Sequence, residues 1–101
     1  MQVPKNDYGF YLNFTVQDSS GVAFILTGYT ITLKVWVEGK PGTLILTGAC
    51  EIVVAASGTC RYSVASGDFA TVGKYLAELE LTSAGVVEST STFTLEVMES
   101  G

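Results

Sequence analysis

Alternating apolar and polar side chains over residues 73–81 constrain the fold more than any other stretch of the chain. One parity carries Tyr75, Ala77, Leu79 and Leu81, and the other carries Lys74, Glu78 and Glu80, with Leu76 as an exception. A period of two residues is typical of a β-strand with one buried face. Tyr75 follows Gly73 where this strand begins, and β-sandwiches use a tyrosine there whose hydroxyl bonds to upstream backbone, expected here near Asp68 or Phe69. We therefore predict that Tyr75 is a structural tyrosine corner.

The same alternation recurs in other short segments, which glycine-containing turns separate. The segments are residues 8–16, 30–37, 43–46, 50–54, 60–64 and 87–97, with a further apolar run at 22–26. Turn-forming compositions lie at 18–21 and 38–42. About seven to eight strands at this spacing predict an all-β chain, an immunoglobulin-like β-sandwich of two antiparallel sheets. At 101 residues the chain is short, and we expect residues 1–101 to form a single domain.

Two hairpin registers follow if the apolar side chains are kept on one face, because opposed residues of an antiparallel pair point the same way. A three-residue loop at 56–58 places Val54 opposite Cys60, with the glycine of the loop in the left-handed conformation. A second loop at 83–85 keeps the odd residues of 87–97 inward and places Glu88 opposite Glu80. With Glu78, these two carboxylates are expected to form a solvated outer face, and a weak cation site is the alternative.

The two cysteines fit poorly as a disulfide in this arrangement. Cys50 and Cys60 would lie on one face, but separated along the ladder by about 13 Å at the rise of a strand. A disulfide needs Cβ atoms about 3.8 Å apart. Two buried free thiols are therefore favoured, and a bridge is the alternative if a β-bulge shifts the register.

Composition argues against several classes of function. The net charge of −5, the pI of about 4.4 and the five scattered basic residues argue against nucleic acid and anionic membranes as partners. No apolar run approaches the roughly 20 residues that span a bilayer, and the start lacks the apolar core of a secretory signal. The chain has no histidine, which removes Ser-His-Asp and Cys-His catalysis and most zinc sites. We expect no enzyme activity, no cofactor and no metal site.

The charged fraction of 15% is low, which suggests that a partner covers part of the surface. Trp36 is expected on the face opposite Leu33 and Val35, either covered by another segment or serving as an anchor at a protein interface. Tyr11 and Tyr29 are weaker candidate interface residues of the same kind. Residues 22–26 and 43–46 are candidate edge strands, whose unpaired backbone groups could accept another strand.

Several short motifs, taken in order, resemble the immunoglobulin-like N-terminal domain of tailed-phage baseplate upper proteins. Residues 26–35 resemble its "LTG-x-T" strand opening, and residues 18–21 resemble the "D-x-x-G" turn before it. Residues 58–62 are similar to its G-x-[apolar]-x-Y strand, Asp68 with 73–75 to its D…G-x-Y corner, and 93–97 to its closing strand. Ile25 departs from the pattern, since the family tends to carry Asp there. The resemblance runs from about Tyr8 to Val97.

This resemblance implies a non-enzymatic structural component of a bacteriophage virion. Such a component would be assembled in the host cytoplasm and would contact other virion proteins, in a homo-oligomeric or symmetric assembly. Because the sequence ends at Gly101 without a further module, we expect a small part: a tail, neck or baseplate accessory, or a head decoration protein. The alternative is an adhesion or carbohydrate-binding β-sandwich module, which would group its aromatic side chains on one exposed face.

Overall fold

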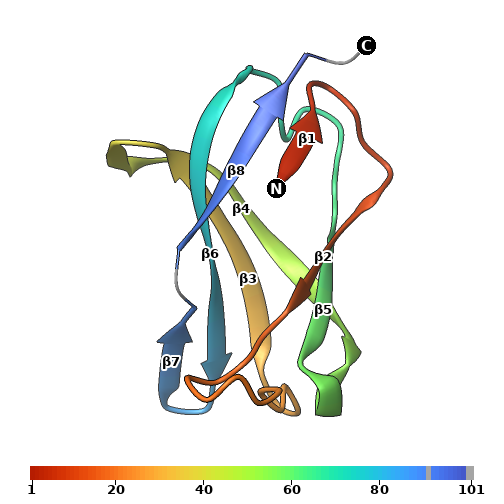
Figure 1. Cartoon of the computed structure of the whole chain (residues 1–101), viewed down its shortest axis with the longest axis vertical. Coiled ribbons are helices and arrows are strands. Elements are labelled where there is room, and N and C mark those ends of the chain that lie inside the picture. The colour runs from red at the N-terminus through yellow and green to blue at the C-terminus, as the bar shows by residue number, and fades with distance from the viewer. Residues whose placement is uncertain (91, 100–101) are drawn as a thin grey trace.

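The computed structural model describes residues 1–90 and 92–99. Within them the chain forms eight strands and one short 3-10 helix (Figure 1). These are β1 (Gln2–Pro4), β2 (Tyr11–Thr15), β3 (Thr30–Val37), β4 (Lys40–Val54), η1 (Ala55–Ser57), β5 (Thr59–Ser63), β6 (Gly73–Ser83), β7 (Val86–Ser89) and β8 (Phe93–Met98). The prediction of an all-β chain with seven to eight strands is confirmed. None of the helical structure in these residues is long and apolar enough to cross a membrane.

The strands form one curled sheet in the order β1-β8-β6-β3-β4-β5-β2, and β7 pairs with β6. β4 produces the curl, because it pairs with β3 over most of its length and with β5 at its end, as Figure 1 shows. β1 runs parallel to β8, whereas the β2–β5 and β3–β6 pairs are antiparallel. The sheet is therefore mixed and continuous, and the division into two antiparallel sheets expected from the sequence is not confirmed.

One apolar core fills the inside of the curl. Alternate residues of β3 and β6 face it, which is the pattern that the sequence predicted for these two strands. Leu12 of β2 and Tyr62 of β5 approach from the other half of the curl, and Val3 of β1 is fully buried. Seventeen apolar residues are buried among the described ones, so the core draws on both ends of the chain as well as its middle.

Both predicted hairpin registers are wrong, and the turns explain why. Ile52 rather than Val54 lies opposite Cys60, because η1 replaces the expected loop and a β-bulge follows Ile52. β6 and β7 are joined by a two-residue turn, since Ser83 pairs directly with Val86. Glu88 consequently lies opposite Leu81 and not opposite Glu80. Residues 87–97 are divided between β7 and β8, and Val87 is 65% exposed instead of facing inward.

Of the two candidate edge segments, only one is part of a strand. Residues 22–26 form no strand: a single bridge joins Gln17 to Ala23, and the Leu26 amide donates to the Ala55 carbonyl at 3.0 Å. Residues 43–46 lie within β4, where the register with β3 shifts on both sides of Trp36. β5 reaches only residues 51–54 of β4. Among the described strands, residues 43–46 therefore have a neighbour on one side alone.

Candidate interaction surfaces

A row of three apolar side chains crosses the outer face of the sheet. Trp36 of β3 alternates with the buried Val35 and so points away from the core. The register places Leu44 of β4 on one side of Trp36 and Leu76 of β6 on the other. We call these three residues the Trp36 row. Leu44 is 52% exposed, and the other two are half-buried. Leu76, the exception in the β6 alternation, thus has a place on this outer face.

Polar side chains surround the Trp36 row. Lys34, Glu78 and Thr92 line a shallow cleft of about 340 Å³ together with Trp36 and Leu44. The Lys34 ammonium lies 2.6 Å from Glu80 Oε2, and this hydrogen bond raises the pKa of Lys34. The result is an apolar centre with a charged margin, the layout in which interface anchors are usually found.

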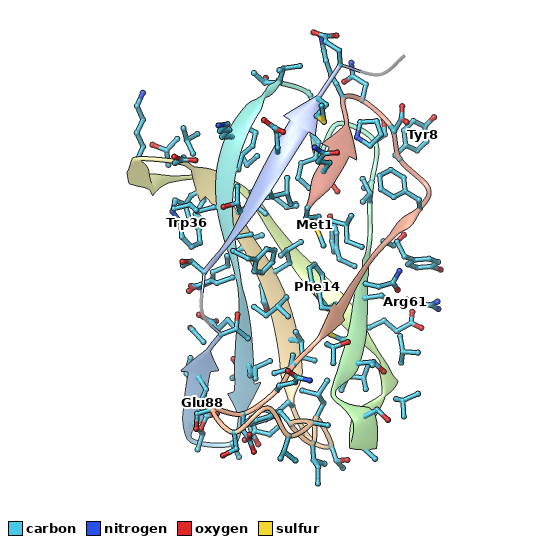
Figure 2. The ribbon with its side chains drawn as sticks, in the orientation of Figure 1. Met1, Tyr8, Phe14, Trp36, Arg61 and Glu88 are labelled. Atoms are coloured by element: carbon cyan, nitrogen blue, oxygen red, sulfur yellow. The ribbon has the colours of Figure 1, made fainter. Side chains whose placement is uncertain are left out.

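Tyr11, the second candidate, lies elsewhere on the molecule. Its ring is on the exposed face of β2, and the Arg61 guanidinium of β5 lies over it at 3.9 Å from the ring centroid. Arg61 also bonds to Glu51 Oε1 at 2.8 Å, from the strand on its other side. In Figure 2, Arg61 and Trp36 lie on opposite sides of the protein. Tyr11 is therefore part of a cation–π and ion-pair group apart from the Trp36 row.

Tyr29, the third candidate, packs against the body of the protein. It is half-buried just before β3, and its ring meets that of Phe24 edge-on, with centroids 5.4 Å apart. Both rings contact the core cluster. The structure thus does not bring Trp36, Tyr11 and Tyr29 together into one surface.

Two buried tyrosines hold the crossing between β5 and β6. The Tyr75 hydroxyl donates to the Thr71 carbonyl at 2.7 Å, four residues upstream and closer in sequence than the acceptor expected near Asp68 or Phe69. The Asp68 carboxylate instead accepts a hydrogen bond from the Tyr62 hydroxyl and one from the Ala65 amide at 2.8 Å. Burial, together with the Asp68 contact, raises the pKa of Tyr62. Both hydroxyls serve to position backbone.

Cys50 and Cys60 are free thiols, Cys60 buried and Cys50 half-buried. Burial raises the pKa of Cys50 to about 12, with a further contribution from Cys60, and burial likewise raises the pKa of Cys60. The raised pKa of each thiol lowers its thiolate fraction at neutral pH, and the thiolate is the nucleophilic form of cysteine.

Acidic side chains are the remaining candidates for a chemical site in the described chain. No group of three or more Cys, Asp or Glu residues there could hold a metal ion. Glu88 is exposed on β7, so the facing pair with Glu80 that the sequence suggested does not form. Sequence reasoning missed Leu44, Leu76 and Arg61 as surface features. The break in the β6 alternation was a usable signal for Leu76, whereas the other two depend on which strands become neighbours.

The comparison with known families places the chain among known proteins. A family model described as the BppU N-terminal domain matches residues 9–101. The chain belongs to this family. Membership of the BppU N-terminal domain family implies a structural protein of a phage baseplate, and hence a virion component that contacts other virion proteins. The baseplate is thus supported among the locations expected from the sequence, and head decoration is not. No curated protein matches the sequence.

Proposed function

We propose that this domain is a non-enzymatic structural module of the baseplate and that the Trp36 row is a surface by which it contacts a neighbouring virion protein. The observation that carries this proposal is the alignment of Trp36, Leu44 and Leu76 across three adjacent strands. The outer face of a sheet ordinarily carries polar residues. Lys34, Glu78 and Glu80, which lie near the Trp36 row, follow this rule, whereas the row itself does not. A tryptophan between two leucines with a charged margin matches the composition of interface hot spots.

We infer that residues 1–101 act as one immunoglobulin-like unit, in which β4 crosses between the two layers of a sandwich. We further infer a symmetric assembly of several copies, formed in the host cytoplasm. Trp36 lies on the opposite side of the protein from Arg61, which covers the Tyr11 ring (Figure 2), and this separation argues against the alternative of a carbohydrate-binding module, which would gather its aromatic rings on one face.

Incorporation into phage particles tests the role of the Trp36 row. Trp36→Ala should leave a folded domain, because the side chain lies outside the core. Truncating a central aromatic anchor of an interface costs about 2 kcal/mol or more, which corresponds to roughly thirtyfold weaker association. We therefore expect quantitative mass spectrometry of purified particles to find the variant strongly depleted.

Tyr8→Ala is the matched control, since Tyr8 is a 63% exposed aromatic residue that lies far from Trp36 in Figure 2. It should be incorporated as efficiently as the unaltered protein. Circular dichroism of both purified variants verifies folding. A folded Trp36→Ala protein present in particles at the normal level would show that the row is not an interface.

A further inference from the structure

The outer edge of β2 has backbone groups without a strand partner. The Val16 amide donates to the Gly58 carbonyl at 2.7 Å, and the Val64 amide donates to the Phe10 carbonyl at 2.9 Å. These bonds fix the hydrogen-bonded pairs of the β2–β5 ladder at the even residues of β2. The amides and carbonyls of Tyr11, Asn13 and Thr15 therefore point away from β5. β2 is the last strand in the sheet order, so no described strand meets them.

A groove lies beside this edge, between β2 and the start of β8. Its volume is about 390 Å³. The apolar residues that line it are Met1, Phe14, Val16, Leu79 and Phe93, and its other lining side chains are uncharged polar ones. The rings of Phe14 and Phe93 approach to 5.6 Å between centroids and join the two walls. Figure 2 shows Met1 and Phe14 near each other in this central region.

The adjoining part of the same opening is already closed by a short extended segment. β1 is three residues long and pairs in parallel with the end of β8, and its Val3 side chain is fully buried in the core. The Glu96 amide donates to Met1, and the Lys5 amide donates to Met98. The groove begins at Met1, the residue before β1. β1 thus demonstrates what fits this opening: an extended backbone with an apolar side chain turned inward.

We propose that the groove receives an extended, uncharged segment of a partner protein, which hydrogen-bonds to the free edge of β2 and places alternate apolar side chains against Phe14 and Phe93. This is strand addition, in which backbone bonds give affinity and side-chain pockets give selectivity. A second copy of the domain is a poorer occupant. Its own β2 keeps Leu12 in its own core, the residue after β2, Val16, is buried there too, and each copy carries a net charge of −5.

This inference rests on the proposed function only in that the domain works through protein contacts, because it does not involve the Trp36 row. The test uses the whole domain and a seven-residue peptide of alternating threonine and valine with blocked ends. Titration is followed by amide NMR spectra. We expect the signals of Tyr11, Asn13 and Thr15 to shift and their hydrogen exchange to slow, while amides bonded to β5 change little.

Two controls separate strand addition from unspecific apolar binding. Asn13→Pro removes an amide on the open edge without touching the β5 ladder and should weaken binding about tenfold or more, whereas Asn13→Thr should bind normally. A version of the peptide with alternate amides methylated should bind the unaltered domain as weakly as the original peptide binds Asn13→Pro. This peptide tests the backbone contact even if Asn13→Pro fails to fold. Equal binding of the methylated peptide, shifts located elsewhere, or self-association through these amides would each overturn the proposal. A Trp36→Ala protein that binds the peptide normally but is lost from particles would separate the two surfaces.

Discussion

At the scale of single residues, two glycines permit contacts that the core requires. Gly58 caps η1 at a φ of 69°, and a Cβ there would lie 2.3 Å from the Val16 carbonyl oxygen and 2.8 Å from that of Phe24. Gly48 lies in the middle of β4, and a Cβ there would lie 2.3 Å from the Tyr62 ring. The composition of the turn predicts the first of these glycines. The second was expected to end a strand, but the ring of Tyr62 covers it and the strand continues.

Gly58→Ala should destabilise the domain by roughly 3 kcal/mol. Left-handed backbone costs an L-residue about 1–2 kcal/mol, and forcing a methyl group against two carbonyls adds about 1–3 kcal/mol. Denaturant unfolding measures the change. Gly67→Ala is the matched control, because Gly67 has a φ of 88° but open space around its Cα. It should lose only about 1 kcal/mol. Equal losses in the two variants would show that the Val16 contact is absent.

At the scale of elements, alternation identified the long strands but not how they pair. β3 and β6 are where the sequence places them, since each has one continuous buried face. Register depends on the turns, and a turn that is one residue shorter transfers every side chain to the other face. The two-residue turn before Val86 does this to β7. Bulges beside Trp36 and after Ile52 have the same effect within β4, and composition alone does not encode them.

Val87 and Val97 provide a matched pair of substitutions that tests this division of residues 87–97. Val97 is 1% exposed in β8, whereas Val87 is 65% exposed in β7. Val97→Thr puts a hydroxyl into the core and should cost about 1–3 kcal/mol. Val87→Thr should stay within about 0.5 kcal/mol of the original stability. Thermal unfolding compares the two, and a large loss from Val87→Thr would support the longer inward-facing strand instead.

At the scale of the whole molecule, the three candidate interface aromatics are exposed or half-buried and lie apart from one another, and their role at an interface stays a prediction. Arg61, whose guanidinium lies over the Tyr11 ring, is on the opposite side of the protein from Trp36, and Tyr29 is packed against Phe24. A sequence shows which side chains leave the core of a strand, but their neighbours on a surface are set by the sheet order. The Trp36 row required the β6-β3-β4 order, and the groove required β2 and β8 to face each other across the curl.

Alkaline pH should destabilise the whole domain. The pKa of Cys50 is about 12 in the folded protein, above its usual value of 9.0. The unfolded chain therefore loses this proton first and binds fewer protons, so the free energy of unfolding falls as pH rises above about 9. The raised pKa of Tyr62 adds to the fall above pH 10 or so.

Denaturant unfolding between about pH 8 and pH 10, the range in which an ordinary thiol titrates, measures this slope. Cys50→Ala should reduce it, because the variant has one fewer thiol whose pKa is higher in the folded protein than in the unfolded chain. The slope that remains should come from Cys60, whose pKa is also raised by burial. If the slope were unchanged in Cys50→Ala, Cys50 would not be a source of the loss of stability at alkaline pH.

The change of partner along β4 has a kinetic consequence. β3, β4 and β5 follow one another in the chain and are neighbours in the sheet, so their contacts close short loops. β1 pairs with β8, which joins the two ends of the chain and closes the longest loop of all. Because loop closure becomes costlier with sequence separation, the central meander should assemble early and the terminal strands should dock last. The seam that is completed last is then the one beside the groove, where a newly made chain would still be open to an incoming strand.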